Sequence, residues 1–302
     1  MYSKILVPLD GSKLAENVLP FARCVARSLQ IPVELLAVVD VAEMARNISA
    51  AKGLFLDTLI DHETRRSGNY LNGIAKNLPV GGVHCTVGKG KAADVIIESA
   101  AAEKNTLIAM ATHGRSGLNR WLLGSVAEKV LRGASNPLLL VRATEKTPPW
   151  EMAALKRVIV PLDGSGLSEL ILPYVEALAK HLDLEVTLLG VYGAPSASGG
   201  TGDGFYNSGQ MHAFIAGLRA ETVTYLAVKT EELKRRGLNK LSFKAKEGLV
   251  ADEIIAMARE TPGTLIAMSS HGRSGMKRWV LGSITETVVR HSDNPVLVVR
   301  AE

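Results

Sequence analysis

The chain has 302 residues, of which 47% are hydrophobic and 22% charged, a composition typical of folded protein with room for two domains. Its formal net charge is +5, without any run of five basic residues, which argues against a nucleic-acid partner. The cysteines, Cys24 and Cys85, lack metal-ligand spacing, and no apolar run approaches the roughly 20 residues of a membrane span. We therefore expect a cytoplasmic protein with reduced thiols, no metal site and no membrane segment.

Two segments of the chain occur twice. KILVPLDGS at 4–12 recurs as RVIVPLDGS at 157–165. HGRSGLNRWLLGSVAEKVLRGASNPLLLVRA at 113–143 recurs as HGRSGMKRWVLGSITETVVRHSDNPVLVVRA at 271–301. Repetition on this scale indicates two tandem copies of one domain.

The boundary between the copies is predicted in the segment TEKTPPW. Pro148 and Pro149 cannot continue a regular element, so we place the domains at 1–146 and 147–302. The second copy is slightly longer between its two shared segments. The Gly- and Ser-rich stretch at 193–209 is the natural place for the insertion, and we expect it to be a mobile lid over a second ligand site.

Each copy alternates short apolar runs with segments of helical periodicity. In the first copy we predict strands at about 4–9, 33–39, 83–87, 106–111 and 138–142, with helices within 13–29, 43–77 and 92–103. This alternation indicates two doubly wound, Rossmann-like domains, each with a five-stranded parallel sheet. A ligand would bind outside the carboxyl ends of the strands, near Asp10 and Gly114.

A Gly-rich segment precedes a predicted helix in each copy. Glycines let backbone N–H groups approach an anion, and a helix N-terminus adds unpaired donors, which suits a phosphate. Arg115 could add a charge-assisted contact. The alternative is purely structural, because Ser125 and Glu128, like Ser283 and Glu286, have the spacing of a capping box.

The motifs together resemble the universal stress protein family. The resemblance rests on the strand followed by Asp-Gly-Ser, on LLAVVD, on MATHGRSGLNRWLLGS and on NPLLLVRA, and it covers nearly the whole chain. ATP-binding members carry a Gly-x2-Gly-x9-Gly-(Ser/Thr) loop. The second and third glycines match in both copies, but the first is replaced by Ala111 and by Ser269. Each replacement adds a Cβ, and we expect the larger Ser269 to weaken its site more.

The resemblance implies ATP, alone or with Mg2+, as the ligand of both copies. The residues it assigns to the two sites are Pro8, Asp10, Ser12, Val38, Ala111, Gly114, Arg115, Gly124, Ser125, Val126, Pro161, Asp163, Ser165, Val191, Ser269, Gly272, Arg273, Gly282, Ser283 and Ile284. Two alternatives stay open: Asp10 and Asp163 could instead cap the following helices, and Val38 and Val191 could be plain strand core.

Other residues near the loops are expected to be structural. His113 and His271 have no nucleophile or second histidine at a useful spacing, and Trp121 and Trp279 would anchor the loops by packing.

The last strand of each copy, PLLLV and PVLVV, is apolar and needs a partner. In the resembling family these strands pair between subunits, so we expect an internal pseudo-dimer, with further association between chains left open.

The sequence leaves three functional hypotheses open. The leading one is an ATP-binding stress or regulatory protein rather than an enzyme. The second is a protein of the same family that acts through partners without nucleotide. The third is an adenylating enzyme, which lacks support because neither an SGGxDS loop nor an HxGH motif occurs in the sequence. Slow hydrolysis of ATP stays open as a further alternative.

Overall fold

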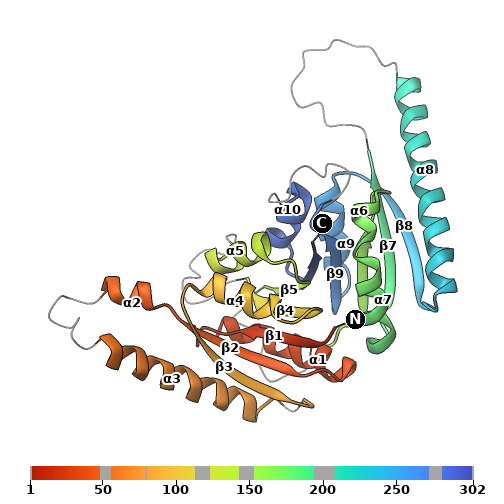
Figure 1. Cartoon of the computed structure of the whole chain (residues 1–302). Helices are drawn as coiled ribbons and strands as arrows, with labels where there is room; N and C mark the ends of the chain where they lie inside the picture. The colour runs from red at the N-terminus through yellow and green to blue at the C-terminus, as the bar shows by residue number, and fades with distance from the viewer. Residues whose placement is uncertain are drawn as a thin grey trace.

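The strands in the described part of the protein form one twisted sheet. The computed structural model describes residues 2–47, 56–78, 80–112, 123–142, 153–193, 208–271 and 281–300. Ten strands run in the order β3-β2-β1-β4-β5-β10-β9-β6-β7-β8, so the second copy repeats the first in reverse order across the middle of the sheet (Figure 1). Every neighbouring pair is parallel except β5 and β10, which are antiparallel.

The two copies contain matching elements, except that α2 of the first copy has no counterpart among the described residues of the second. The first consists of β1 (Lys4–Pro8), the 3-10 helix η1 (Ala15–Val18), α1 (Leu19–Leu29), β2 (Val33–Val39), α2 (Val41–Asn47), α3 (Leu56–Lys76), β3 (Val83–Lys89), α4 (Ala92–Ala101), β4 (Thr106–Ala111), α5 (Ser125–Gly133) and β5 (Leu138–Val141). The second consists of β6 (Arg157–Pro161), α6 (Gly166–Glu169), α7 (Leu172–Leu182), β7 (Glu185–Tyr192), α8 (Ser208–Arg235), β8 (Leu241–Glu247), α9 (Val250–Arg259), β9 (Thr264–Ser269), α10 (Ser283–His291) and β10 (Val296–Val299).

Helices cover both faces of the sheet, as a buried parallel sheet requires. Successive residues of a strand point to opposite faces, so Leu139 joins the core under α1, α3, α7 and α8. Its neighbours Leu138 and Leu140 join the core under α4, α5, α9 and α10. Both cores include residues from the two copies, so the copies share their hydrophobic interior.

The two copies meet along the paired final strands. Leu297 lies opposite Leu139, and Val296 and Val298 lie opposite Leu140 and Leu138. This pairing confirms the expected packing of the two copies through their apolar C-terminal strands.

Charged contacts flank that seam. Arg142, just after β5, pairs with Asp293 at 2.6 Å. Helices α5 and α10 add two crossed ion pairs, Arg132 to Glu286 at 3.6 Å and Arg290 to Glu128 at 3.8 Å. These contacts hold the helices of the two copies beside each other (Figure 1).

The predicted strands and fold class are confirmed, with differences in the helices. The segment 43–77 contains two helices, α2 and α3, and residues 48–55 between them lie outside the described part. The predicted boundary TEKTPPW also lies outside it, as do residues 194–207 of the proposed lid. Ser208 and Gly209 of that stretch already belong to α8.

No helix in the described ranges is both long enough and apolar enough to cross a membrane.

The shared core makes a prediction for stability. Leu297 is fully buried, so Leu297→Ala should lower the free energy of unfolding by about 2–5 kcal/mol. The same change at Leu249, which is 63% exposed, should lower it by less than about 1 kcal/mol. Urea unfolding of both variants checks this. Similar losses at the two positions would contradict the shared interior.

Candidate functional site

Each copy has a switch point in its strand order. β1 lies between β2 and β4, and the chain leaves β1 toward β2 but later returns to its other side as β4. The crossover helices therefore diverge at the carboxyl ends of β1 and β4, where crevices form in such sheets. Pro8 ends β1 and Ala111 ends β4, so these predicted residues lie at this edge. Pro161 and Ser269 end β6 and β9 in the same way.

The Asp-Gly-Ser segment forms the same tight turn in both copies. Ser12 donates to Asp10 Oδ1 through its backbone N–H at 2.9 Å and through its hydroxyl at 2.6 Å. Ser165 makes the same two bonds to Asp163. The glycine between them has φ of 82° in each copy, a left-handed conformation that favours glycine.

The alternative prediction that these aspartates cap the following helices is wrong. The cap is the serine: Ser165 is the N-cap of α6 and accepts from the Ser168 N–H at 3.1 Å. Ser12 likewise accepts from the Ala15 N–H, at the first residue of η1. The aspartate instead orients the serine, because its carboxylate accepts the serine hydroxyl hydrogen.

The helix starts of α5 and α10 also correct an expectation. The N-cap of α5 is Gly124, in an extended conformation, and Ser125 is the first helical residue. Glu128 bonds to Arg132 rather than to the helix start. The capping-box interpretation is therefore wrong here, and it is wrong for Ser283 and Glu286 of α10 for the same reason.

As a result, both helices present an open start. The first intrahelical bond of α5 runs from Glu128 N–H to Gly124 O at 2.8 Å, and the N–H groups of residues 125–127 have no acceptor among the residues that the structure describes. Ser125 is exposed and Val126 is half-buried. In α10 the matching residues Ser283 and Ile284 are both exposed. These starts can accept an anion.

The glycine before each helix has a structural task of its own. Gly124 N–H donates to Thr112 O at 2.8 Å, and Gly282 N–H donates to Ser270 O at 2.9 Å. A Cβ added at Gly282 would lie 2.8 Å from that same carbonyl oxygen. Gly282 is therefore required by the close approach of α10 to the end of β9, whatever binds there.

The second copy carries extra hydroxyl contacts at this place. Ser269 Oγ donates to the His271 carbonyl, and Thr285 Oγ1 donates to the carbonyls of Ser269 at 3.0 Å and Ser270 at 3.4 Å. Thr285 is 2% exposed. The first copy has Ala111 and Ala127 at the positions of Ser269 and Thr285, and alanine cannot make these bonds.

His271 lies beside these hydroxyls. Its Nδ1 is 3.0 Å from Ser270 Oγ, and its Nε2 is buried without a hydrogen-bond partner among the described residues. Burial lowers the pKa of His271, and the nearby positive charge of Arg300 lowers it further. The imidazole is therefore held in its neutral form at neutral pH.

The remaining predicted residues fall into two groups. Val38 and Val191 are partly buried and their side chains pack against the core under α4, α5, α9 and α10, as the strand-core alternative expected. Gly114, Arg115, Gly272, Arg273, His113, Trp121 and Trp279 lie outside the described residues.

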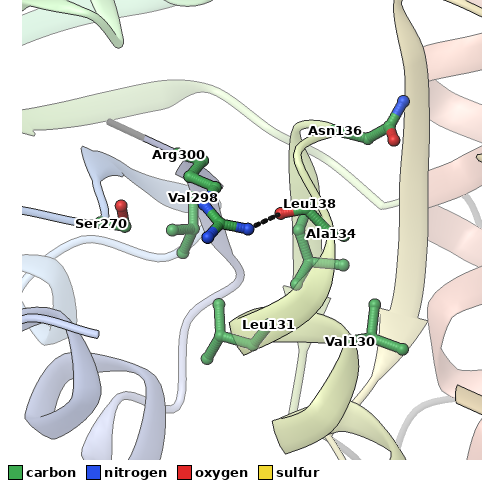
Figure 2. Close-up of a pocket in the computed structure, with 8 residues that line it drawn as sticks. All are labelled: Val130, Leu131, Ala134, Asn136, Leu138, Ser270, Val298 and Arg300. Carbon is green, nitrogen blue, oxygen red and sulfur yellow. Dashed lines mark hydrogen bonds between the residues drawn. The ribbon is translucent and has the colours of Figure 1, made fainter. Parts of the chain in front are cut away.

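Two of the hollows among the described residues are considered for the site. One of about 10 Å3 lies at the seam between the copies, large enough for about one water molecule. There Arg300 reaches across to the Ala134 carbonyl at 3.4 Å (Figure 2). The other, of about 550 Å3, is an open groove along α8 lined by Tyr192, Arg219, Glu247 and neighbouring residues. Neither contains any of the predicted ATP contacts.

Sequence reasoning missed Thr285 and Arg300. Thr285 could have been found by comparing the copies, because SVAEKV aligns with SITETV and exchanges Ala127 for a hydroxyl residue. Arg300 has the same residue type as Arg142 in the repeat, so the alignment gave no signal. Their contacts depend on how the copies pack.

Both halves of the chain match known proteins. The profile of the Universal stress protein family matches residues 1–142 and 154–300. Universal stress protein MJ0531 of Methanocaldococcus jannaschii is 32% identical over 146 residues, covering 48% of this chain and 85% of the relative. Universal stress protein Slr1230 of Synechocystis is 22% identical over 314 residues, covering 98% of this chain and 99% of the relative.

A solved structure shares the whole architecture. The crystal structure of a universal stress protein from Archaeoglobus fulgidus has a TM-score of 0.68 at 21% identity and covers 99% of this chain and 98% of its own. The strand order and the two matching helix starts define a tandem α/β protein with two equivalent strand switch points. The chain belongs to the Universal stress protein family, with two such domains in tandem.

The environment of His271 makes a prediction for pH dependence. The pKa of His271 is lowered on folding from the ordinary histidine value of about 6.5. Around and below pH 6.5 the unfolded chain therefore binds more protons than the folded chain. The stability that neutral His271 contributes is thus present above this pH and is lost as the pH falls through the lowered pKa. In a nuclear magnetic resonance titration, His271 should protonate below pH 6.5. Arg300→Gln should raise this pKa part of the way and Arg300→Lys should leave it low. An unchanged pKa in Arg300→Gln would contradict the role of that charge.

Proposed function

We propose that each domain binds ATP, and that the protein acts as a nucleotide-dependent regulator rather than as an enzyme. The observation that carries this proposal is the open helix start next to the strand switch point, present twice. Its N–H groups, which have no acceptor in the described part of the chain, and its exposed serine hydroxyl suit a phosphate, which carries negative charge and accepts hydrogen bonds.

The neighbouring residues fit the rest of a nucleotide. Pro8 and Asp10 lie at the end of β1, next to β2, where Val38 lies near the end of the strand. The nucleoside would occupy this side and the phosphates would extend toward Ser125 and Val126. In the second copy Pro161, Asp163, Val191, Ser283 and Ile284 take the same roles. Mg2+ would accompany the phosphates, since it usually binds through them with few protein ligands.

A charge placed at each helix start tests the phosphate position. Ser125→Asp puts a carboxylate where the phosphate would bind, so ATP binding at the first site should be lost by repulsion. The same carboxylate favours the helix N-terminus by about 0.3–1 kcal/mol, so the protein without ligand should be as stable or more stable. Calorimetric titration should show one site remaining in Ser125→Asp, one in Ser283→Asp, and none in the double variant.

The matched control is Ser125→Asn, which has a similar size without the charge and should retain binding within about tenfold. Valine at Gly282 is a poorer test, because it would collide with the Ser270 carbonyl even without ligand. ATP binding by the double aspartate variant at the level of the parent would show that the helix starts are only structural. Absence of binding by the parent would favour action through protein partners.

A second experiment tests whether ATP is consumed. The groups at the helix starts are hydrogen-bond donors, which stabilise bound phosphates without activating water. We therefore expect phosphate release by the parent protein to equal that of the Ser125→Asp/Ser283→Asp double variant. Faster release by the parent, abolished in the double variant, would make the protein an ATPase.

A further inference from the structure

We propose that Ser269 and Thr285 preorganise the second nucleotide site, so that the second domain binds ATP more tightly than the first. This inference rests on the proposed function and concerns a difference between its two sites. It reverses the expectation that Ser269, being larger than Ala111, would weaken its site.

The first step of the argument is the direction of the Ser269 hydroxyl. It donates to the His271 carbonyl two residues later, and Ser269 is 5% exposed. The side chain is therefore used to fix the turn that leaves β9. The Ser269 hydroxyl is therefore engaged within the turn.

The second step is the link between that turn and the helix. Thr285, in the first turn of α10, donates to the carbonyls of Ser269 and Ser270. Ser270 O also accepts from Gly282 N–H at 2.9 Å. Thus the strand end, the turn and the helix start are joined by three side-chain and backbone bonds. In the first copy Gly124 N–H to Thr112 O is the backbone equivalent, and Ala111 and Ala127 supply no hydroxyl.

The third step relates the order of the helix start to the affinity for ATP. A phosphate binds at a helix start only when the N–H groups are held in place. If these groups become ordered only on binding, the loss of conformational entropy lowers the affinity for ATP. Bonds that exist before the ligand arrives remove this loss. One ordinary hydrogen bond corresponds to a factor of about 2 to 13 in an equilibrium constant, so we expect about a tenfold difference between the sites.

Single-site proteins measure this difference directly. Ser125→Asp leaves only the second site and Ser283→Asp leaves only the first. Calorimetric titration with MgATP should give a dissociation constant about tenfold lower for the protein with the second site. Adding Ser269→Ala and Thr285→Ala to the Ser125→Asp protein should raise its dissociation constant about tenfold. These alanines are the residues that the first copy carries at the same places, so the fold should accept them.

Thr287→Ala is the matched control, because Thr287 lies on the same helix but donates to Ser283 O within α10 at 2.8 Å. It should leave the dissociation constant unchanged. Without ligand, the Gly282 N–H should exchange with solvent about tenfold more slowly than the Gly124 N–H, and the Ser269→Ala/Thr285→Ala change should remove the difference.

The outcomes separate the two ideas. Equal affinities of the two single-site proteins, or an affinity unaffected by loss of the two hydroxyls, would overturn the preorganisation of the second site while leaving ATP binding intact. Absence of binding at both sites in the parent protein would overturn the proposed function and this inference together.

Discussion

The antiparallel pairing of β5 with β10 sets the arrangement of everything else. It joins two parallel sheets into one and removes two apolar edges that would otherwise be open to aggregation. Because the strands of the two copies run in opposite directions, their carboxyl ends lie at opposite edges of the sheet. The two candidate sites therefore face away from each other, although they belong to one continuous core.

The same pairing brings α5 and α10 side by side in opposite directions. Arg290, in the last turn of α10, lies 3.8 Å from Glu128 in the first turn of α5, and Arg132 approaches Glu286 in the way expected for an approximate two-fold axis. The start of each helix is thus separated from the start of the other by about one helix length, roughly 14 Å for nine residues. Ligands at the two sites would face opposite ends of one packed helix pair.

The sequence was sufficient to predict the strands, the fold class and the seam between the copies. Periodicity reveals strands and helices locally, and a repeat with apolar final strands indicates where two copies pair. It was insufficient at the helix starts. Ser125 and Glu128 have capping-box spacing whether the serine is the cap or the first helical residue, and only the extended conformation of Gly124 decides. The Arg300 contact with Ala134 depends on long-range packing that no local pattern contains.

The glycines of the loop show why a motif alone cannot establish a binding site. At Gly282 a side chain is excluded by the Ser270 carbonyl, so glycine is required even if no phosphate ever binds. The same close approach, however, is what places the start of α10 at the end of β9. A structural requirement and the proposed functional one therefore concern the same residue, because the geometry that brings the helix to the switch point also places its first N–H groups there. Function can be tested separately only at positions that the fold itself does not require. Ser125 and Ser283 are such positions, since both are exposed and neither caps its helix.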